Sequence, residues 1–231
     1  MILSFLIWLL VLPLQIVLLI AALLAEFASL GLGAFRKSFA LTRVTSKKCS
    51  IVILNWNGRD LLQECLPAVT RAVERADGNH EILVVDNGSS DDSMEWTRRH
   101  FPEVETLELD ENLGFGEGNN RGVAAASNEI VVLLNNDMIV SSSFLTPLLE
   151  PFGDPDIFAV SSQVFLPPGQ QREETGNTFG RFEKGYFHLS HEPLREHHMT
   201  RRFLPILWAG GGSSAFRRDY FLRLGGVSAI F

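Results

Sequence analysis

Apolar residues follow two different periods along the chain, and the alternation between them predicts a layered α/β fold. Short continuous apolar runs, typical of strands buried on both faces, are separated by segments in which apolar residues recur every three or four positions. The predicted strands are residues 49–56, 81–90, 104–109, 129–134 and 158–166. The predicted helices are residues 59–76, 91–100, 118–126, 141–152 and 220–224. Strands and helices that alternate in this order are typical of a doubly wound, mostly parallel sheet.

Two features interrupt the regular pattern. Pro67 lies inside the first predicted helix, where it predicts a kink or a break. Neither period is visible from Pro167 to His198, a segment rich in Gly, Glu, His and Arg, so we expect a long irregular excursion there. The second predicted helix follows Ser90 and Asp91, and either residue could cap it.

The first part of the chain has a different character, because residues 2–25 contain no charged side chain. As a helix this stretch would span about 36 Å, which exceeds the hydrocarbon core of about 30 Å. The stretch is also longer than the apolar region of about 7–15 residues in a cleaved signal peptide, which is the alternative interpretation. We therefore predict a retained transmembrane helix, within an anchor of residues 1–35.

A basic linker, residues 36–48, follows this anchor and contains no acidic residue. Positively charged flanks stay in the cytoplasm. The sequence therefore predicts a single-pass membrane protein whose remaining domain, residues 49–231, is cytoplasmic.

The composition of the chain limits the other classes of function. The 231 residues are 46% hydrophobic and 20% charged, as in a globular domain with an appendage. The net charge of −7 gives no overall basic surface for nucleic acid. Cys49 and Cys65 are too few for a disulfide scaffold and fit a reducing compartment, and we interpret both as small buried apolar residues.

Short polar side chains follow three of the predicted strands at the point where each strand ends. These are residues 55–58 (NWNG), residues 86–90 (DNGSS) and residues 135–137 (NND). Each run alone is typical of a turn, but the carboxyl ends of parallel strands meet at one edge of the sheet, where ligands bind in open α/β folds. Asp137, which follows two amides, would suit a Mg²⁺ ion that also binds the phosphate oxygens of a ligand.

A glycine-rich segment, residues 111–122 (ENLGFGEGNNRG), lies between the third and fourth predicted strands. A helix that begins near Gly118 would direct backbone N–H groups towards an anion. The segment matches neither the P-loop nor the dinucleotide-binding fingerprint. A flexible connection remains the alternative.

Four motifs, IVILNWNG, ILVVDNGSSDDS, ENLGFGEGNNRG and VVLLNNDMIV, resemble in this order the family 2 glycosyltransferases, most closely the rhamnosyltransferase-like branch. The resemblance covers about residues 50–226. It implies a GT-A-type nucleotide-binding fold, a nucleotide-diphospho-sugar donor, a divalent cation (Mg or Mn), and inverting transfer of the sugar to an acceptor hydroxyl. The membrane anchor suggests a sugar or lipid-linked acceptor, as in the synthesis of cell-envelope polysaccharide or glycolipid.

The resemblance also assigns roles to individual residues. The donor-binding residues that it implies are Asn55, Asn57, Asp86, Asn87, Ser89, Asn112, Gly114, Asn119 and Asn135. Asp137 matches the metal carboxylate of the family's D-x-D motif, in which Asn135 here replaces the first acid. Residues 208–226 resemble the acceptor-side segment, with Trp208, Gly210 and Gly211 as its candidate residues. Trp208 could stack on a sugar ring or simply pack in the core.

The catalytic base that the family implies is not found. An acidic pair is expected after the glycine pair, but Gly225 and Gly226 are followed by Val227, Ser228 and Ala229. We therefore expect the base beyond Phe231, so the C-terminal part of the domain is missing and the catalytic residue is unknown. The alternative function is a truncated, non-catalytic membrane protein that binds a nucleotide-sugar.

Two further interpretations are disfavoured. A sugar-1-phosphate nucleotidyltransferase would need a Gly-rich loop with Arg and Lys after the first strand, which residues 55–58 do not supply. A zinc site at His188, His191, His197 and His198 has no cysteine nearby, so solvated loop histidines are the preferred reading.

Overall fold

The computed structural model describes residues 15–21, 24, 44, 48–76, 79–165, 177–191 and 203–227. The chain divides into two compact units, Met1–Leu41 and Thr42–Phe231. In the first unit, residues 15–21 and 24 are helical and their side chains are exposed. Among the described residues, no helix combines the length and the apolar character that crossing a membrane requires. The predicted transmembrane helix lies largely on residues outside those described, so the anchor remains a prediction.

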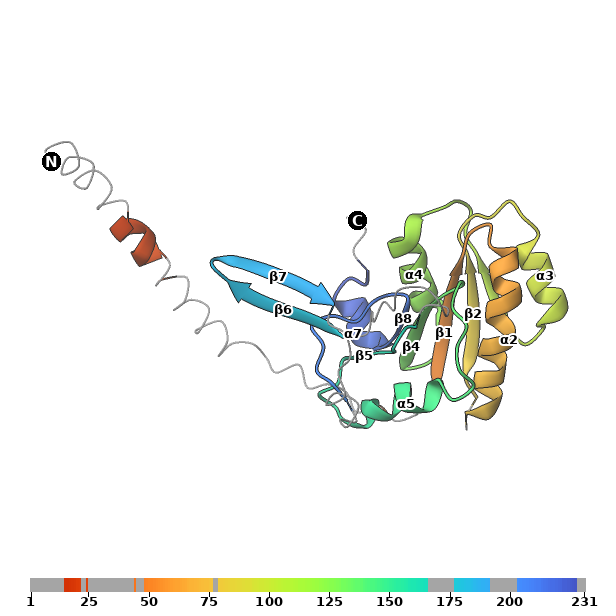
Figure 1. Cartoon of the computed structure of the whole chain (residues 1–231). Coiled ribbons are helices and arrows are strands. Elements are labelled where there is room, and N and C mark those ends of the chain that lie inside the picture. Colours follow the sequence, from red (N-terminus) through yellow and green to blue (C-terminus); the bar gives the residue numbers. More distant parts are fainter. Residues whose placement is uncertain are drawn as a thin grey trace, which may run out of the picture. The chain divides into compact units, whose positions relative to one another are not determined.

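A six-stranded sheet in the order β3-β2-β1-β4-β8-β5 forms the centre of the second unit (Figure 1). Its strands are β1 (Cys49–Asn55), β2 (Glu81–Asp86), β3 (Glu105–Glu108), β4 (Ile130–Asn135), β5 (Ala159–Ser161) and β8 (Ser213–Arg217). The first four strands along this order pair in parallel, whereas β8 is antiparallel to both β4 and β5. The predicted mostly parallel sheet is confirmed.

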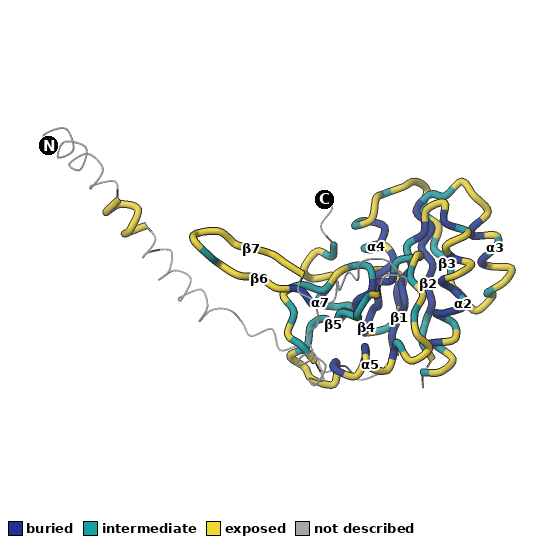
Figure 2. Tube along the Cα trace, viewed as in Figure 1, coloured by how far each residue is buried: buried dark blue, intermediate teal, exposed yellow. Residues whose placement is uncertain are grey.

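Helices cover both faces of this sheet. They are α2 (Arg59–Arg75), α3 (Ser93–His100), α4 (Gly114–Ala125), α5 (Leu145–Leu149), the short 3-10 helix η1 (Glu150–Gly153) and α7 (Arg218–Arg223). Successive residues of a strand point to opposite faces. Ile51 and Ile53 therefore join one apolar cluster, with residues of α2, α3 and α5, while Val52 joins another, with residues of α4 and α7. Figure 2 shows the resulting buried strands at the centre of the domain.

Helix α4 packs close to the sheet because glycine occupies two of its positions that face the strands. A Cβ atom on Gly122 would lie 2.7 Å from Cγ2 of Val85, and one on Gly118 would lie 2.6 Å from Cδ1 of Leu54. The sequence predicted that this helix begins near Gly118, but it begins at Gly114. The predicted start is wrong by four residues because Asn87 holds residues 112–114 against the end of β2, as described below.

Several other predicted boundaries differ from the structure. Helix α2 is not broken at Pro67. The N-cap residue of α3 is Asp92, although the side chain of Asp91 accepts a hydrogen bond from the backbone N–H of Ser93. The predicted helix 141–152 is reduced to α5 and η1, and the predicted strand 158–166 is reduced to β5. Strand β8 was not predicted, since its sequence SSAFR has no apolar run.

The segment predicted to be irregular contains a β-hairpin in its described part. Strands β6 (Thr178–Glu183) and β7 (Tyr186–His191) pair antiparallel as a separate two-stranded sheet. Lys184 and Gly185 connect them with φ angles of 52° and 84°. Two consecutive positive φ angles are typical of the turns that join tight hairpins. Figure 1 shows the hairpin extending away from the central sheet.

Candidate functional site

The three polar strand ends meet at one edge of the sheet, as the sequence predicted. Asn55 at the end of β1 lies opposite Asp86 at the end of β2. Leu54 lies opposite Asn135 at the end of β4 on the other side. These ends, with the loops that follow them, form the candidate site.

Asn55 connects the loops of this edge, although its side chain does not reach the surface. Its exposed fraction is 0%. Its side-chain oxygen accepts a hydrogen bond from Nδ2 of Asn136 at 2.9 Å, and its Nδ2 donates to Oγ of Ser93 at 3.0 Å. A Cβ atom on Gly58 would lie 2.5 Å from Nδ2 of Asn136, so only glycine leaves room for this pair. The Asn55 amide therefore positions neighbouring loops in this structure.

Asn57 joins the loop after β1 to the loop after β2. Its backbone N–H donates to Oγ of Ser89 at 2.8 Å, and its side-chain oxygen accepts from the backbone N–H of Ser90 at 2.7 Å. The residue has a φ of 49°, a left-handed conformation that asparagine tolerates better than most residues. Asn57 is itself exposed, so it lies at the open surface of the site.

Asp91 strengthens the same junction. Burial alone would raise the pKa of Asp91, but hydrogen bonds from Ser93 and from the backbone N–H of Arg59 outweigh it, and the pKa of Asp91 is lowered. The carboxylate is therefore kept in its charged, hydrogen-bond-accepting form.

Asp86 carries the most informative atom of the site. The residue is only 5% exposed. Its Oδ2 accepts a hydrogen bond from the backbone N–H of Ser89 at 3.1 Å, while its Oδ1 is buried and has no hydrogen-bond partner among the described residues. An unpaired buried carboxylate oxygen is costly, and such groups in native proteins call for an explanation. A ligand that supplies an N–H or O–H donor would provide one.

Asn87 fastens the glycine-rich segment to the end of β2. Its Nδ2 donates to Oδ1 of Asn112 at 2.9 Å and to the carbonyl oxygen of Gly114 at 3.2 Å. Its Oδ1 accepts from the backbone N–H of Leu113 at 2.9 Å. Gly88 permits this approach, because its φ is +71° and a Cβ atom there would lie 2.6 Å from the carbonyl carbon of Glu111. The first turn of α4 is thereby held beside the second strand end.

Asn119 supports that turn from within the helix. Its side chain is buried and donates to the carbonyl oxygen of Phe115 at 2.8 Å. Together with Asn55 and Asn87, it is a predicted donor-binding residue whose amide is already engaged with the protein. Their contact with a donor stays a prediction, and their observed contribution is to position the loops.

The end of β4 carries the predicted metal ligand. Asp137 is exposed and makes no hydrogen bond or ion pair with another described residue. Among the described residues, no group of three or more His, Cys, Asp or Glu side chains could hold a metal ion. Any cation at Asp137 would therefore need most of its ligands from water and from a bound phosphate group, as Mg²⁺ commonly takes them.

The predicted acceptor-side segment lies directly against this strand end. The carbonyl oxygen of Gly212 accepts a hydrogen bond from the backbone N–H of Asn135 at 2.9 Å. A Cβ atom on Gly211 would lie 3.1 Å from the ring of Phe115, whereas one on Gly210 would meet nothing within 4 Å. The donor-side and acceptor-side segments are thus neighbours.

Trp208 is partly buried. Its exposure is intermediate between that expected for packing in the core and that expected for stacking on a sugar ring, the two alternatives that the sequence left open. Its backbone N–H donates to Oγ1 of Thr178 at 3.1 Å, and its carbonyl oxygen accepts from the same hydroxyl at 2.9 Å. Its ring meets the ring of His191 edge-on, with centroids 5.2 Å apart. Trp208 is therefore fixed by the base of the β6–β7 hairpin.

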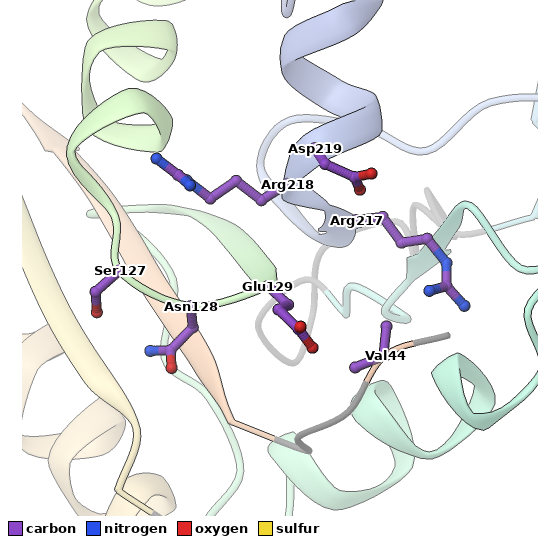
Figure 3. A pocket seen from close by; sticks show the side chains of 7 residues that line it. All are labelled: Val44, Ser127, Asn128, Glu129, Arg217, Arg218 and Asp219. Carbon is purple, nitrogen blue, oxygen red and sulfur yellow. The ribbon is translucent and has the colours of Figure 1, made fainter. Parts of the chain in front are cut away.

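A separate pocket opens at the opposite edge of the sheet (Figure 3). It is lined by Val44, Ser127, Asn128, Glu129, Arg217, Arg218 and Asp219. Both arginines are engaged with the protein: Arg217 donates to the carbonyl oxygens of Ile157 and Asp154, and Arg218 donates to that of Val123. Since residues 127–129 precede β4, this pocket lies away from the strand ends and is not part of the candidate site.

Comparison with known proteins identifies the family. Residues 50–225 match the family described as glycosyl transferase family 2, and the chain belongs to this family. It is 34% identical over 91 residues to glycosyltransferase AglE of Haloferax volcanii, covering 38% of this chain and 30% of that protein. It is 25% identical over 199 residues to the O-antigen biosynthesis protein RfbC of Myxococcus xanthus. This match covers 80% of this chain and 15% of that protein.

Solved structures confirm the GT-A-type fold. The mannosyltransferase PcManGT from Pyrobaculum calidifontis, in complex with GDP-Man and Mn²⁺, gives a TM-score of 0.55 at 21% identity, covering 91% of this chain and 58% of that one. Residues 1–349 of TarS from S. aureus give a TM-score of 0.54 at 14% identity. This match covers 77% of this chain and 49% of that one. At these identities the likeness shows the fold alone. The chain spans less than two thirds of each of these four proteins.

Proposed function

We propose that this chain is a glycosyltransferase that binds a nucleotide-diphospho-sugar at the edge formed by the ends of β1, β2 and β4. The observation that carries the proposal is the buried, unpaired Oδ1 of Asp86 at the end of β2. In a chain of family 2, an N–H of the nucleobase or a ribose hydroxyl is the donor best suited to this oxygen. Two structural neighbours support the donor class, since PcManGT was solved with GDP-Man and TarS with UDP.

The residues near Asp137 fit a divalent cation. Its carboxylate is exposed, is not engaged by another described residue, and lies two positions after Asn135, whose backbone contacts the acceptor-side segment. A single carboxylate with phosphate oxygens is a usual arrangement for Mg²⁺. A bound Mg²⁺ or Mn²⁺ would offset the negative charge that develops on a departing diphosphate.

The chain's own residues orient the two substrates. The bonds among Asn57, Ser89 and Ser90 fix the loops that would flank the nucleotide. On the acceptor side, the open space at Gly210 would let a sugar approach the backbone. Trp208, held in place by Thr178, could stack on that sugar.

The proposed reaction is an inverting transfer to an acceptor hydroxyl, in the synthesis of envelope polysaccharide or glycolipid at the cytoplasmic face of a membrane. The uncharged residues 2–25 and the basic residues 36–48 support this location. The similarity to RfbC, an O-antigen biosynthesis protein, supports the product class. Such a reaction needs a positioned base to accept the hydroxyl proton.

A second candidate function is nucleotide-sugar binding without transfer. It is favoured by Val227, Ser228 and Ala229, which follow the glycine pair at the positions where the family resemblance implies an acidic pair. Both candidates share the donor site, so the donor experiment tests them together. A transfer assay with nucleotide-sugars and lipid-linked acceptors then separates them.

The donor experiment measures the thermal stability of the full chain in detergent with UDP, GDP or dTDP, each with and without Mg²⁺ or Mn²⁺. A ligand at about 100 times its Kd stabilises a protein by about 2.7 kcal/mol. We expect one nucleotide to raise the midpoint only with the cation, and Asp137→Ala to abolish the cation-dependent part. Glu74→Ala, an exposed acid in α2, is the matched control and should respond like the parent chain. No shift with any nucleotide, or an unchanged shift in Asp137→Ala, would contradict the proposal.

A further inference from the structure

The β6–β7 hairpin has one apolar and one polar face. Residues paired across the two strands share a face, and the faces alternate along each strand. Phe182 pairs with Phe187 and Gly180 with Leu189, which places the three large apolar side chains on one face. Arg181 pairs with His188, Glu183 with Tyr186 and Phe179 with Ser190, so the charged side chains of the two strands all lie on the other face, together with the aromatic rings of Phe179 and Tyr186. The ribbon is therefore amphipathic.

The apolar face continues to the acceptor-side segment. A Cβ atom on Gly180 would lie 2.5 Å from Cδ2 of Leu207 and 2.7 Å from Cζ of Phe187, so Leu207 lies over this face. The next residue, Trp208, contacts His191, which pairs with Thr178 on the same face. A single apolar stripe thus runs from Trp208 to the tip of the hairpin.

This stripe is exposed to a degree that isolated surface residues do not explain. Phe182 is 71% exposed, Phe187 58% and Leu189 61%. Figure 2 shows exposure along nearly the whole length of both strands. A contiguous exposed apolar stripe of this kind is a candidate site of contact with a protein or a membrane.

The size of the ribbon argues against a stable protein partner. Six residues per strand extend about 20 Å, and two strands lie about 5 Å apart. Such a face is much smaller than the roughly 800 Å² per partner of a stable protein interface. A bilayer requires no minimum matching area, and a weak contact suffices when another part of the chain keeps the domain near the lipid.

The charges of the hairpin favour the same occupant. Within residues 177–191, Arg181 forms an ion pair with the single acid Glu183 at 2.7 Å, and Lys184 gives the hairpin an excess of one positive charge, in a chain whose net charge is −7. Arginine and lysine side chains can extend from a buried apolar ribbon to lipid headgroups, and they are attracted by anionic lipids. The uncharged stretch of residues 2–25 supplies a candidate tether.

We propose that the apolar face of the β6–β7 hairpin docks into the interfacial region of a bilayer that contains anionic lipids. The stripe then brings the segment around Trp208 close to the lipid surface. This docking requires neither donor binding nor sugar transfer, so it can hold or fail independently of the proposed function.

The experiment places an environment-sensitive fluorophore on each face of the hairpin in the full chain. Phe187→Cys carries the label on the apolar face, and His188→Cys carries it on the polar face. Burial raises the pKa of both native thiols to about 12, so Cys49 and Cys65 should not react, and the parent chain serves as the labelling blank. The proteins are reconstituted into phosphatidylcholine and phosphatidylglycerol vesicles with or without doxyl-labelled lipid.

We expect doxyl lipid to quench the label at position 187 at least twofold more than the label at position 188. Doxyl quenching does not depend on which way the protein is inserted, so mixed orientation cannot mask the difference. Equal quenching at the two positions, or quenching at neither, would overturn the proposal. Concentration-dependent energy transfer between labelled chains in detergent would show instead that the stripe contacts a second copy.

A second pair of variants guards against distortion by one substitution. Phe182→Cys and Arg181→Cys lie directly across from positions 187 and 188, on the same two faces, and should repeat the difference. Unchanged thermal midpoints would show that these exposed substitutions leave the fold intact. Absence of the difference in this pair as well as the first would be decisive against docking.

Discussion

The side-chain amide of Asn136 donates a hydrogen bond to the side-chain oxygen of Asn55, 2.9 Å away, and so joins the end of β4 to the end of β1. Asn136 immediately precedes Asp137, the proposed cation ligand. Because Asn55 also bonds Ser93 at the start of α3, one buried amide links the loops that follow three strands. The position of the exposed carboxylate thus depends on a fully buried residue at the end of the neighbouring strand.

Replacing Asn55 by alanine should destabilise the fold as well as weaken donor binding. The change removes the side-chain hydrogen bonds to Asn136 and Ser93 at a fully buried position. Each polar group left without a partner costs about 1–3 kcal/mol. Urea unfolding of the two chains would measure the difference. Asn136→Ala, which leaves the Asn55–Ser93 bond in place, is the control and should cost less. Equal stability of Asn55→Ala and the parent chain would refute the positioning role.

Asp86→Asn should weaken nucleotide binding without lowering the stability of the fold. The asparagine oxygen can still accept from the backbone N–H of Ser89, while the amide group replaces the buried oxygen that now has no partner. We therefore expect the free energy of unfolding of the ligand-free chain to be maintained or raised. The affinity for the nucleotide should fall at least tenfold, which corresponds to about 1.4 kcal/mol.

Isothermal titration with the nucleotide found in the thermal assay would measure this loss. Glu74→Gln, which makes the same chemical change at an exposed position in α2, should bind as the parent chain does. An Asp86→Asn chain that binds normally would show that the unpaired oxygen does not face the ligand.

The central sheet and the meeting of its polar ends could be predicted because parallel strands impose both. Residues 51–54 and 130–134 are continuous apolar runs, which only burial on two faces explains, and parallel pairing brings the carboxyl ends to one edge. The residue types at those ends then indicated a site. The local sequence was therefore sufficient to predict the central sheet and the edge at which its polar ends meet.

The use of individual amides could not be predicted in the same way. Whether Asn87 faces a ligand or the protein depends on how closely residues 112–114 approach it, which is set by tertiary packing. The same contacts moved the start of α4 from Gly118 to Gly114. A motif resemblance identifies such residues, but it does not distinguish a residue that contacts the ligand from one that holds a loop in place.

Strands β6, β7 and β8 were missed for different reasons. The hairpin strands TFGRFE and YFHLSH mix aromatic residues with Gly, His and charges, and neither face is buried in a core. Strand β8 is short and is fixed by antiparallel pairing with both β4 and β5, which lie far from it in sequence. The Lys184–Gly185 turn was the one local signal available, since glycine favours a positive φ.

Gly122→Ala should destabilise the domain by forcing α4 away from the sheet. The added methyl group would meet the side chains of Val52 and Val85, which belong to neighbouring central strands. Overpacking of this kind typically costs about 1–3 kcal/mol. Gly153→Ala, at a position with nothing within 4 Å of the new atom, is the matched control and should change little. Thermal unfolding of the pair measures the effect, and equal midpoints would contradict the close packing of α4.

The stability of the fold should fall between pH 7.5 and pH 5.5 because of His80. Burial, and secondarily the positive charge of Lys48, lower the pKa of His80 from its usual value of 6.5. Nδ1 of His80 accepts a hydrogen bond from the backbone N–H of Cys49 at 3.2 Å, which requires the neutral ring. Well above pH 6.5 neither the folded nor the unfolded chain binds the proton, so the full stability is present. Below that pH the unfolded chain takes up the proton first, and stability is lost as the pH falls through the folded pKa.

His80→Asn tests this assignment, because an asparagine oxygen can accept the same backbone hydrogen bond but does not titrate in this range. Urea unfolding at half-unit pH steps should show a shallower decline for His80→Asn than for the parent chain. Parallel curves would assign the decline to other groups. The comparison is informative because His80 directly precedes β2 and contacts Cys49 at the start of β1, at the opposite edge from the strand ends. Its substitution therefore tests the fold without altering the proposed donor site.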